Sequence, residues 1–361
     1  MWKQQIAEHI DYPTLIIVFL LVCIGLGMIY STTHTLKNPY AYLTRQMLWV
    51  FLALLWLIVI TGIDYQFFYR YAWYFYGINL ILLIAVFIAG HRAMGAVRWL
   101  NIAGLKFQPS ELSKIIIIFA LGSYLSAVGE NIKRIPQLIG AFLIVGIPMV
   151  LIIKQPDLGT AMVLVPILFA MLFLAGAKVK HLLSIIGCSI FASPFLYMTL
   201  KEYQKKRLLV FLDPENDPLG AGYNIIQSKI AVGSGWLFGK GWLHGTQTQL
   251  EFIPEHHTDF IFSAYAEEFG FIGILIILIL FTLLLYRLFS WIKLTDDQQG
   301  MLAITGFATL LAAHIVINIG MTIGIMPVTG LPLPFVSYGG SALINFATAV
   351  GLAMNIHKRN L

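Results

Sequence analysis

The stretch FIGILIILILFTLLLY, residues 271–286, contains no charged side chain and shows no alternation between apolar and polar positions. With its apolar flanks it is long enough to cross a bilayer as a helix, which takes about 20 residues. Similar uncharged windows recur from one end of the chain to the other. Strands of a membrane barrel instead alternate within short segments. The pattern therefore predicts an all-α polytopic membrane protein and argues against a β-barrel.

The composition indicates the same class of protein. Of the 361 residues, 59% are hydrophobic and 11% are charged, whereas roughly a quarter of the residues of a soluble domain are charged. The mean hydropathy is +0.82. The formal net charge is +6, but no basic run with interleaved aromatic residues accompanies it. We therefore expect this charge to meet anionic membrane lipid and no nucleic acid.

The apolar windows predict about ten transmembrane helices within one integral membrane domain, residues 1–361. The predicted spans are 13–31, 45–63, 72–90, 111–128, 136–153, 158–176, 181–200, 259–289, 300–325 and 337–356. One connection is long, the loop 201–258 between spans seven and eight, and its residues 223–232 have the apolar spacing of a short interfacial helix. Short loops on the side of both termini hold more Lys and Arg, which favours cytoplasmic termini and an extracytoplasmic long loop.

The stretch KFQPSELSK, residues 106–114, begins a predicted span with ionisable residues. Ser110 is placed to cap the helix, and Glu111 lies in its first turn. Lys114 follows on the same face, so that the two charges can pair. Two interpretations stay open. The pair is either structural, or it lines a polar cleft on the outer face, since ionisable groups within a span usually face a cavity.

Cationic residues on the predicted outer face raise a question of binding. Arg45, Arg98, Lys114 and Arg207 would together form a surface suited to phosphate or pyrophosphate, because guanidinium groups bind oxyanions in a bidentate way. Taken singly, each side chain could instead simply extend to the membrane interface, without a role in binding. Asp157, in KQPDLGTA (residues 154–161), lies in a short turn and could simply cap the next helix.

The stretch IMPVTGLPLPFVSYGGSA, residues 325–342, separates the last two predicted spans and is rich in Pro and Gly. Irregular backbone at membrane depth is tolerated where it is buried in protein or lines a water-filled cavity. An ordinary extracellular turn would explain the composition as well. Both interpretations stay open.

The stretch PEHHTDFIFSAYAEEFG, residues 254–270, gathers four carboxylates at the start of a span: Glu255, Asp259, Glu267 and Glu268. Thr258 or Asp259 could cap that helix. A carboxylate at the membrane mouth, flanked by cations, could equally act as a general base. Glu267 and Glu268 lie two turns deeper, about 12–14 Å along the helix, and at least one of them should face the protein interior.

Two other motifs are weak. The glycines of GSGWLFGKG, residues 233–241, are spaced loosely like a phosphate loop, but no strand precedes them, so a nucleotide site is not expected. His256 and His257 are adjacent and cannot easily share one metal ion, and the chain has no HExxH pattern. We therefore expect no dedicated metal site.

Several polar motifs together resemble the shape, elongation, division and sporulation (SEDS) family, and most closely its rod-elongation branch. They are FQPSELSK, QPDLGTA, LLVFLDPENDPLGAGYNIIQSKIAVGSG, GKGWLHGTQTQLEFIPEHHTDFIF, AEEFGFIG and GLPLPFVSYGGSA. They occur in the family's order and cover nearly the whole chain. Apolar helices alone would not reproduce such polar motifs by chance.

The resemblance implies a peptidoglycan glycosyltransferase that polymerises lipid II on the outer face of the cytoplasmic, or inner, membrane. The family's catalytic aspartate matches Asp259. The positions that the resemblance assigns to substrate binding are Arg45, Arg98, Glu111, Lys114, Asp157, Arg207 and Ser337. Those that would support the cleft are Gln108, Ser110, Thr258, Glu267 and Glu268.

The resemblance also implies partners. These are a class B penicillin-binding protein, which supplies transpeptidation, and elongation proteins of the MreC and MreD types. A divalent ion such as Mg²⁺ or Mn²⁺ could assist at the pyrophosphate, although no cofactor is firmly implied. The alternative function is a lipid II flippase, which would need a polar route through to the inner leaflet. A non-catalytic scaffold for the penicillin-binding protein is a third interpretation.

Overall fold

The computed structural model describes residues 11–36, 38–93, 96–102, 105–199, 205, 209–218, 220, 222–250, 252–253 and 257–360. Each of the ten predicted spans overlaps one helix. These helices are α2 (Tyr12–Thr33), α3 (Pro39–Gly62), α5 (Ala72–Ala89), α6 (Pro109–Val128), α7 (Ile135–Lys154), α8 (Leu158–Leu174), α9 (Val179–Thr199), α13 (Ile261–Leu294), α14 (Gln298–Thr322) and α15 (Gly340–Arg359).

Six of these helices are long and apolar enough to cross a membrane: α2, α3, α6, α7, α13 and α14. The apolar helices α5, α8 and α9 are shorter. α15 carries several polar residues, among them the buried Asn345, Asn355 and His357. The chain is therefore a helical membrane protein.

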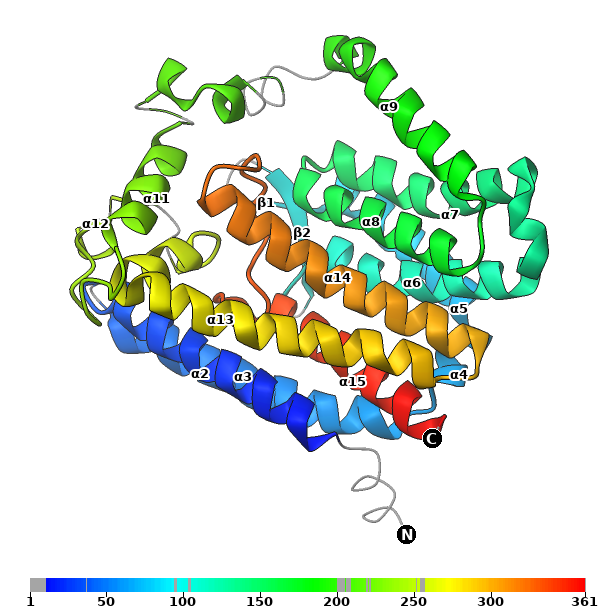
Figure 1. Ribbon diagram of the computed structural model, residues 1–361, viewed down its shortest axis with the longest axis horizontal. Coiled ribbons are helices and arrows are strands. Elements are labelled where there is room, and N and C mark those ends of the chain that lie inside the picture. Colours follow the sequence, from blue (N-terminus) through cyan, green and yellow to red (C-terminus); the bar gives the residue numbers. More distant parts are fainter. Residues whose placement is uncertain are drawn as a thin grey trace.

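Short elements complete the described chain. They are α4 (Tyr65–Arg70), the 3-10 helices η1 (Gly129–Lys133) and η2 (Pro214–Asn216), α11 (Tyr223–Ser234) and α12 (Thr246–Gln249). α11 confirms the helix expected at 223–232. In Figure 1, α9 leans away from the bundle, and α11 and α12 lie at the opposite edge.

The prediction that every element is helical is wrong in one place. Before α6, the strands β1 (His91–Ala93), β2 (Ala96–Ile102) and β3 (Leu105–Phe107) form an antiparallel sheet in the order β1-β2-β3. The connection between the predicted spans 72–90 and 111–128 is thus a small sheet, whose strands follow α5 and lead into α6.

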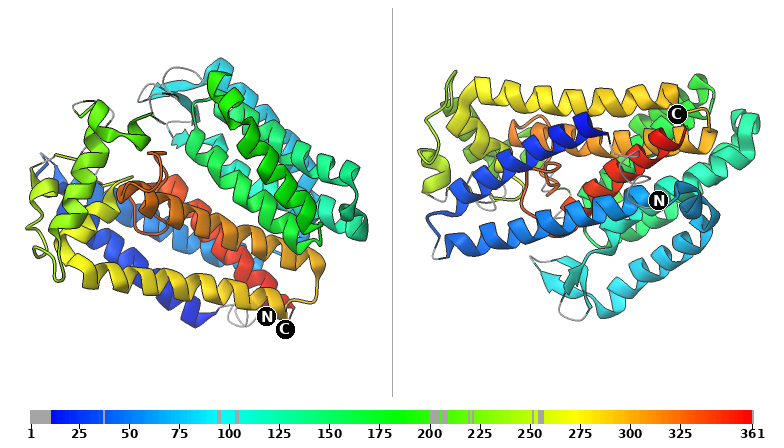
Figure 2. Two further views of the ribbon diagram at one scale, coloured as in Figure 1. Left: turned by 45° about the horizontal axis from the view of Figure 1, so that its top comes forward. Right: turned by 90° about the horizontal axis from the view of Figure 1, so that it is seen from below.

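α14 lies at the centre of the bundle. It packs against α13 on one side and against α6 and α8 on the other, and it also contacts α11 and α15. It is the most deeply buried of the six long apolar helices. Figures 1 and 2 show α13, α2 and α3 on one side of it and α5 to α8 on the other. Side chains on α14 can therefore reach both halves of the molecule.

The bundle has two ends that differ in content. The terminus end holds the start of α2, the junctions α3–α4 and α13–α14, and the end of α15. The ion pairs Arg287–Asp11 and Arg359–Asp64, and the hydrogen bond from Tyr65 to Asp297, join these parts. The site end holds the starts of α6, α8 and α13 and the segment 325–339. Figure 2 shows the start of α2 and the end of α15 at the same end of the bundle.

α13 is interrupted at Gly270 (φ 62°, ψ −159°). Residues 235–241 fill the interruption, and Gly239 lies so close to the carbonyl of Glu268 that a Cβ atom would not fit. Four backbone hydrogen bonds of 2.8–3.1 Å join the two segments: Phe271 N to Trp236 O, Ile272 N to Leu237 O, Lys240 N to Glu267 O and Gly241 N to Glu268 O. Gly235 and Gly239 of GSGWLFGKG thus serve close backbone packing against a broken helix.

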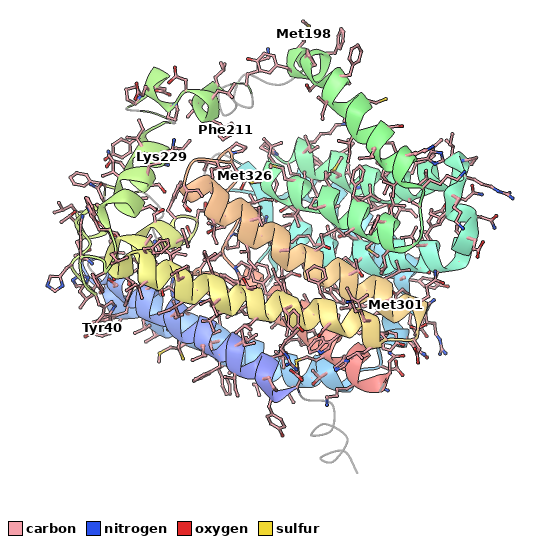
Figure 3. All side chains as sticks on the ribbon, viewed as in Figure 1. Tyr40, Met198, Phe211, Lys229, Met301 and Met326 are labelled. Atoms are coloured by element: carbon pink, nitrogen blue, oxygen red, sulfur yellow. The ribbon has the colours of Figure 1, made fainter. Side chains whose placement is uncertain are left out.

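α11 ties the outer loop to the two central helices. Ser228 Oγ lies 2.6 Å from Ser263 Oγ of α13 and donates to the carbonyl of Thr322 of α14 at 2.6 Å. Lys229, labelled in Figure 3 near Met326, lies against Gly324 just after α14. The described part of the outer loop is thereby fixed to the site end.

Candidate active site

Asp259 lies in the turn 257–260 that leads into α13. The helix begins at Ile261 with Phe260 as its N-cap and without a side-chain cap, so the expectation that Thr258 or Asp259 caps it is wrong. The side chain of Asp259 is half-buried. A Cβ atom on Gly330, which has φ +73°, would lie 3.2 Å from Asp259 Oδ2. The carboxylate therefore faces the backbone of the segment 325–339.

That segment is buried in the protein, as one interpretation of the sequence expected. Leu331, Leu333 and Val336 are almost fully enclosed. An ordinary surface turn does not describe this segment. Its irregular backbone lies between α14, α15 and the turn of Asp259.

Ser337 holds the segment and the Asp259 turn together. Its hydroxyl donates to the carbonyl of Thr258 at 2.7 Å and accepts from the N–H of Leu333 at 2.8 Å. The N–H of Tyr338 donates to the carbonyl of His257 at 3.1 Å. The rings of His257, Tyr338 and Tyr42 pack with their centroids 5.2–5.7 Å apart. The turn before Asp259 is thus held on two sides.

Asn318 of α14 also contacts the turn 257–260. Its Nδ2 donates to the carbonyl of Asp259 at 2.9 Å and to the carbonyl of Leu331 at 2.7 Å. The side chain is fully buried. Both backbones that flank the carboxylate are therefore bound by one amide group.

Glu111 and Lys114 form the expected pair, with 2.8 Å between Lys114 Nζ and Glu111 Oε2. Lys114 is completely enclosed, and Asn345 Nδ2 donates to the same Glu111 oxygen at 3.3 Å. Lys114 Nζ also lies 3.0 Å from His314 Nε2. An ammonium group only donates, so Nε2 accepts and the Nδ1–H of His314 donates to the carbonyl of Pro332 at 3.2 Å. The ion pair is thereby connected to the segment 325–339.

Asp157 joins the starts of α6 and α8. It caps α8 through the N–H of Thr160, at 3.2 Å, which confirms the capping interpretation. Its Oδ2 accepts from Ser110 Oγ at 2.8 Å and from Gln108 Nε2 at 3.1 Å. α6 begins at Pro109 with Gln108 as its N-cap, so the expected capping role of Ser110 is wrong. Its hydroxyl reaches the neighbouring helix instead.

Glu267 and Glu268 are both buried, where at least one was expected to be. Glu267 pairs with Lys240 at 2.7 Å and accepts further hydrogen bonds from the outer loop, from Thr246 Oγ1, Gln247 N, Thr248 N and Thr248 Oγ1. Glu268 accepts from the hydroxyl of Ser31 at the end of α2. These two side chains organise the outer loop around the broken part of α13.

The expected cationic surface is only partly described. Arg45 lies exposed on α3. The backbone of Arg98 lies in β2, but its side chain and the whole of Arg207 are outside the described residues. Their approach to Asp259 stays a prediction. The described residues place no group of three His, Cys, Asp or Glu side chains together that could hold a metal ion.

Three polar residues at this end were not singled out from the sequence: His314, Asn318 and Asn345. Each lies within a largely apolar span. The spacing of His314 and Asn318, one helical turn apart, was a usable signal, because polar residues within a span rarely face lipid. Nothing in the sequence identified the carbonyl groups that they bind.

The geometry suits proton transfer. A half-buried carboxylate lies at one end of a membrane bundle, its backbone is fixed from two directions, and the lysine of the buried ion pair is bound within the same polar network. A carboxylate held in this way can accept a proton from a hydroxyl group that is placed beside it.

Comparisons with known proteins show which family and which solved structures this chain resembles. A family model described as cell cycle protein, covering FtsW, RodA and SpoVE, matches residues 12–361. The peptidoglycan glycosyltransferase MrdB of Escherichia coli K12 is 38% identical over 97% of this chain and 94% of that protein. A chain from a peptidoglycan synthase complex that coordinates polymerization and crosslinking is similar with a TM-score of 0.85 and 32% identity, covering 97% of this chain and 98% of that one. The crystal structure of the rod shape determining protein RodA of Thermus thermophilus gives a TM-score of 0.73 and 30% identity, with 97% of both chains covered.

Proposed function

The chain belongs to the SEDS family and is a peptidoglycan glycosyltransferase, and we propose that it polymerises lipid II with Asp259 as the general base. The observation that carries the proposal is the position of Asp259. Its carboxylate faces Gly330, while Asn318 binds its carbonyl and Ser337 binds that of Thr258. Such fixation holds a catalytic group in the geometry of reaction, which lowers the entropic part of the barrier.

In the proposed reaction, Asp259 removes the proton of the GlcNAc 4-hydroxyl of the acceptor. The freed oxygen forms a bond to the anomeric carbon of the MurNAc of the donor. The bond from that carbon to the pyrophosphate oxygen breaks, and undecaprenyl pyrophosphate leaves with the electron pair. Attack opposite to the leaving group gives an inverted, β-1,4-linked product. Asp259 then returns its proton to solvent.

Charge develops on the departing pyrophosphate. We assign its stabilisation to Arg45, Arg98 and Arg207, because guanidinium groups bind such oxyanions in a bidentate way. The burial of Glu111, Lys114, Asp157 and Ser337 supports a positioning role for these four rather than direct contact with the substrate. We assign supporting roles to Gln108 and Ser110, which bind Asp157, and to Thr258, whose carbonyl binds Ser337. Glu267 and Glu268 hold the outer loop.

We place the ten helices that match the predicted spans, the shorter ones included, across the bacterial cytoplasmic membrane as one domain. Both termini then lie in the cytoplasm, and the site end with the loop 201–258 lies outside. This assignment agrees with the excess of Lys and Arg in the short loops near the termini. It places Asp259 on the face where the lipid-linked sugars are polymerised.

The similarity to a chain of a peptidoglycan synthase complex supports a crosslinking partner for this protein. We propose that the partner is a class B penicillin-binding protein. Proteins of the MreC and MreD types complete the proposed assembly. Polymerisation and crosslinking would then occur side by side during cell elongation.

The function is tested by incubating lipid II in detergent with the purified protein and its penicillin-binding partner, whose transpeptidase is inactivated. Detergent has no separate leaflets, so glycan chains cannot arise from flipping. We expect chains from the wild type and none from Asp259→Ala, which must still bind the partner. Chains from both would remove Asp259 from the chemistry. No chains from either, beside an active related enzyme, would support the lipid II flippase instead.

A further inference from the structure

The side chain of Asn318 binds the two backbone segments beside the Asp259 carboxylate, namely the turn 257–260 and the segment 325–339. It lies on α14, the most deeply buried of the long apolar helices. Its two amide hydrogens are both used, one on the carbonyl of Asp259 and one on that of Leu331. Its Oδ1 is buried and finds no partner among the described residues. The amide orientation is set by the two acceptors, because only Nδ2 can donate to them.

The carbonyl of Asp259 lies just outside the regular hydrogen bonds of α13. In the first turn of that helix, the N–H groups of Ser263 and Ala264 donate to the carbonyl of Phe260. Backbone carbonyls in a protein interior are normally paired with a donor, and Asn318 is a donor to the carbonyl of Asp259. Asn318 also donates to the carbonyl of Leu331, which lies in the irregular segment 325–339. Asn318 therefore joins the Asp259 turn to the segment that its carboxylate faces, in addition to the contacts that Ser337 and Tyr338 make with the preceding residues.

One helical turn earlier, His314 binds the carbonyl of Pro332 and contacts Lys114. α14 therefore carries two donors that bind neighbouring carbonyls of one segment. The donor at His314 is connected to the Glu111–Lys114 pair, and the donor at Asn318 is connected to Asp259. Through these contacts the rigid helix fixes the position of the carboxylate relative to the ion pair.

We propose that Asn318 is a positioning residue for Asp259. It acts through the backbone carbonyl of Asp259 and does not touch the substrate. This inference rests on the proposed role of Asp259 as the general base. A displacement of about 1 Å at a reacting group can lower a rate by about 100-fold, so loss of both donors should lower kcat strongly.

The test compares Asn318→Leu with Asn355→Leu. Leucine is close in size to asparagine and cannot donate. Asn355 is a matched control on α15: it is fully buried, its Nδ2 donates to the carbonyl of Thr61 at 2.6 Å, and its Oδ1 also lacks a partner among the described residues. It lies at the terminus end, far from the Asp259 turn in the fold.

Both variants should lose thermal stability in detergent, since Asn318→Leu removes two hydrogen bonds and Asn355→Leu removes one. In the lipid II polymerisation assay, kcat should fall by about 100-fold for Asn318→Leu, with KM for lipid II unchanged. Asn355→Leu should keep the wild-type kcat. Hydrogen exchange should rise over residues 257–264 in the first variant only. If Asn318→Leu does not fold, Asn318→Ser, which keeps one donor, should show a smaller fall in kcat with KM again unchanged.

Equal kcat values for the two leucine variants would overturn the inference, as would a raised KM with unchanged kcat for Asn318→Leu. Asp259→Ala belongs in the same assay. If Asp259→Ala is inactive and the Asn318 variants behave as wild type, only the positioning role fails. If Asp259→Ala is active, the proposed general base fails and the positioning role fails with it.

Discussion

The two ends of the bundle are held together by different kinds of polar contact. At the terminus end, partly exposed side chains pair with one another: Arg287 and Arg359 each keep about a third of their side-chain surface in contact with the surroundings. At the site end, buried side chains bind backbone. Asn318, Ser337 and His314 each contact a carbonyl of a non-helical segment.

The difference has an energetic consequence. A partly exposed ion pair contributes about 0–1 kcal/mol, because water and salt replace it readily. A buried donor or charge that loses its partner costs about 1–5 kcal/mol, since nothing takes the partner's place. We therefore expect the buried contacts of the site end to be more sensitive to single substitutions than the partly exposed ion pairs of the terminus end. Buried side chains supply several of the hydrogen bonds that hold the irregular backbone around Asp259.

The largest effect on stability is expected for Lys114→Met. It leaves the Glu111 carboxylate buried without its cation, which should lower the free energy of unfolding by about 3–5 kcal/mol. Lys133→Met is the matched control, because Lys133 and Glu130 have the same spacing of three residues but are exposed, at 49% and 95% of their side chains. Unfolding in detergent measures both variants. Equal losses would contradict the comparison of the two ends.

Glu267→Gln should have the next largest effect. The amide loses the charge that faces Lys240 and cannot accept all the hydrogen bonds that converge on Glu267, and bonds to a charged group contribute about 1.5–3 kcal/mol. Hydrogen exchange should rise across residues 235–249, the loop that fills the interruption of α13. An unchanged exchange pattern in this loop would mean that Glu267 does not organise it.

Gly330→Ala tests the surroundings of the carboxylate. An alanine at this position must adopt a positive φ, which costs about 1–2 kcal/mol. Its Cβ atom also crowds Asp259 Oδ2. Gly129→Ala carries the same kind of backbone strain at φ +53° but has open space around the new atom, at the terminus end. We expect similar losses of stability and a lower polymerisation rate only for Gly330→Ala. A normal rate for that variant would remove Gly330 from the site.

The smallest effect concerns Asp11 and the acid side of the stability profile. Burial alone would raise the pKa of Asp11, but hydrogen bonds from Thr14 and the nearby Arg287 outweigh it and hold the pKa below its ordinary value. Because the folded pKa is depressed, this stabilisation is present above the ordinary pKa of about 3.9 and is lost as pH falls through the folded value. Asp11→Asn should therefore be less stable than wild type at pH 7, by at most about 1 kcal/mol. Thermal unfolding from pH 7 to pH 3 should show the difference shrinking. A difference that is independent of pH would contradict the assignment.

The helices could be predicted from the sequence because uncharged windows of bilayer length leave the chain few alternatives. The sheet β1-β2-β3 could not, since its strands are short and lie between two strong helical signals. The interruption of α13 at Gly270 was also missed. It depends on a partner, the segment 235–241, whose backbone satisfies the groups that a helix break leaves free. Apolar windows carry no information about such a pairing.

For the candidate site, the sequence predicted which polar groups lie at this end of the molecule better than it predicted which groups they contact. The pair Glu111–Lys114 follows from a spacing of three residues on one helix. The cap at Asp157 follows from a turn before a span. By contrast, Ser110 looked like a cap and instead donates to Asp157, which lies 47 residues away in the chain. The roles of Asn318 and Ser337 depend on carbonyl groups of distant segments, which only the fold brings near.

The central claim is that the carboxylate of Asp259 accepts a proton during polymerisation. It is tested most directly by the initial rate of glycan chain formation with Asp259→Asn, which keeps the shape and the backbone contacts of the residue but removes its basic oxygen. Asp213→Asn, an exposed aspartate of the outer loop, is the control. We predict a fall of about 100-fold or more for Asp259→Asn, with normal folding and partner binding, and the wild-type rate for Asp213→Asn. A rate for Asp259→Asn equal to that of the control would contradict the account.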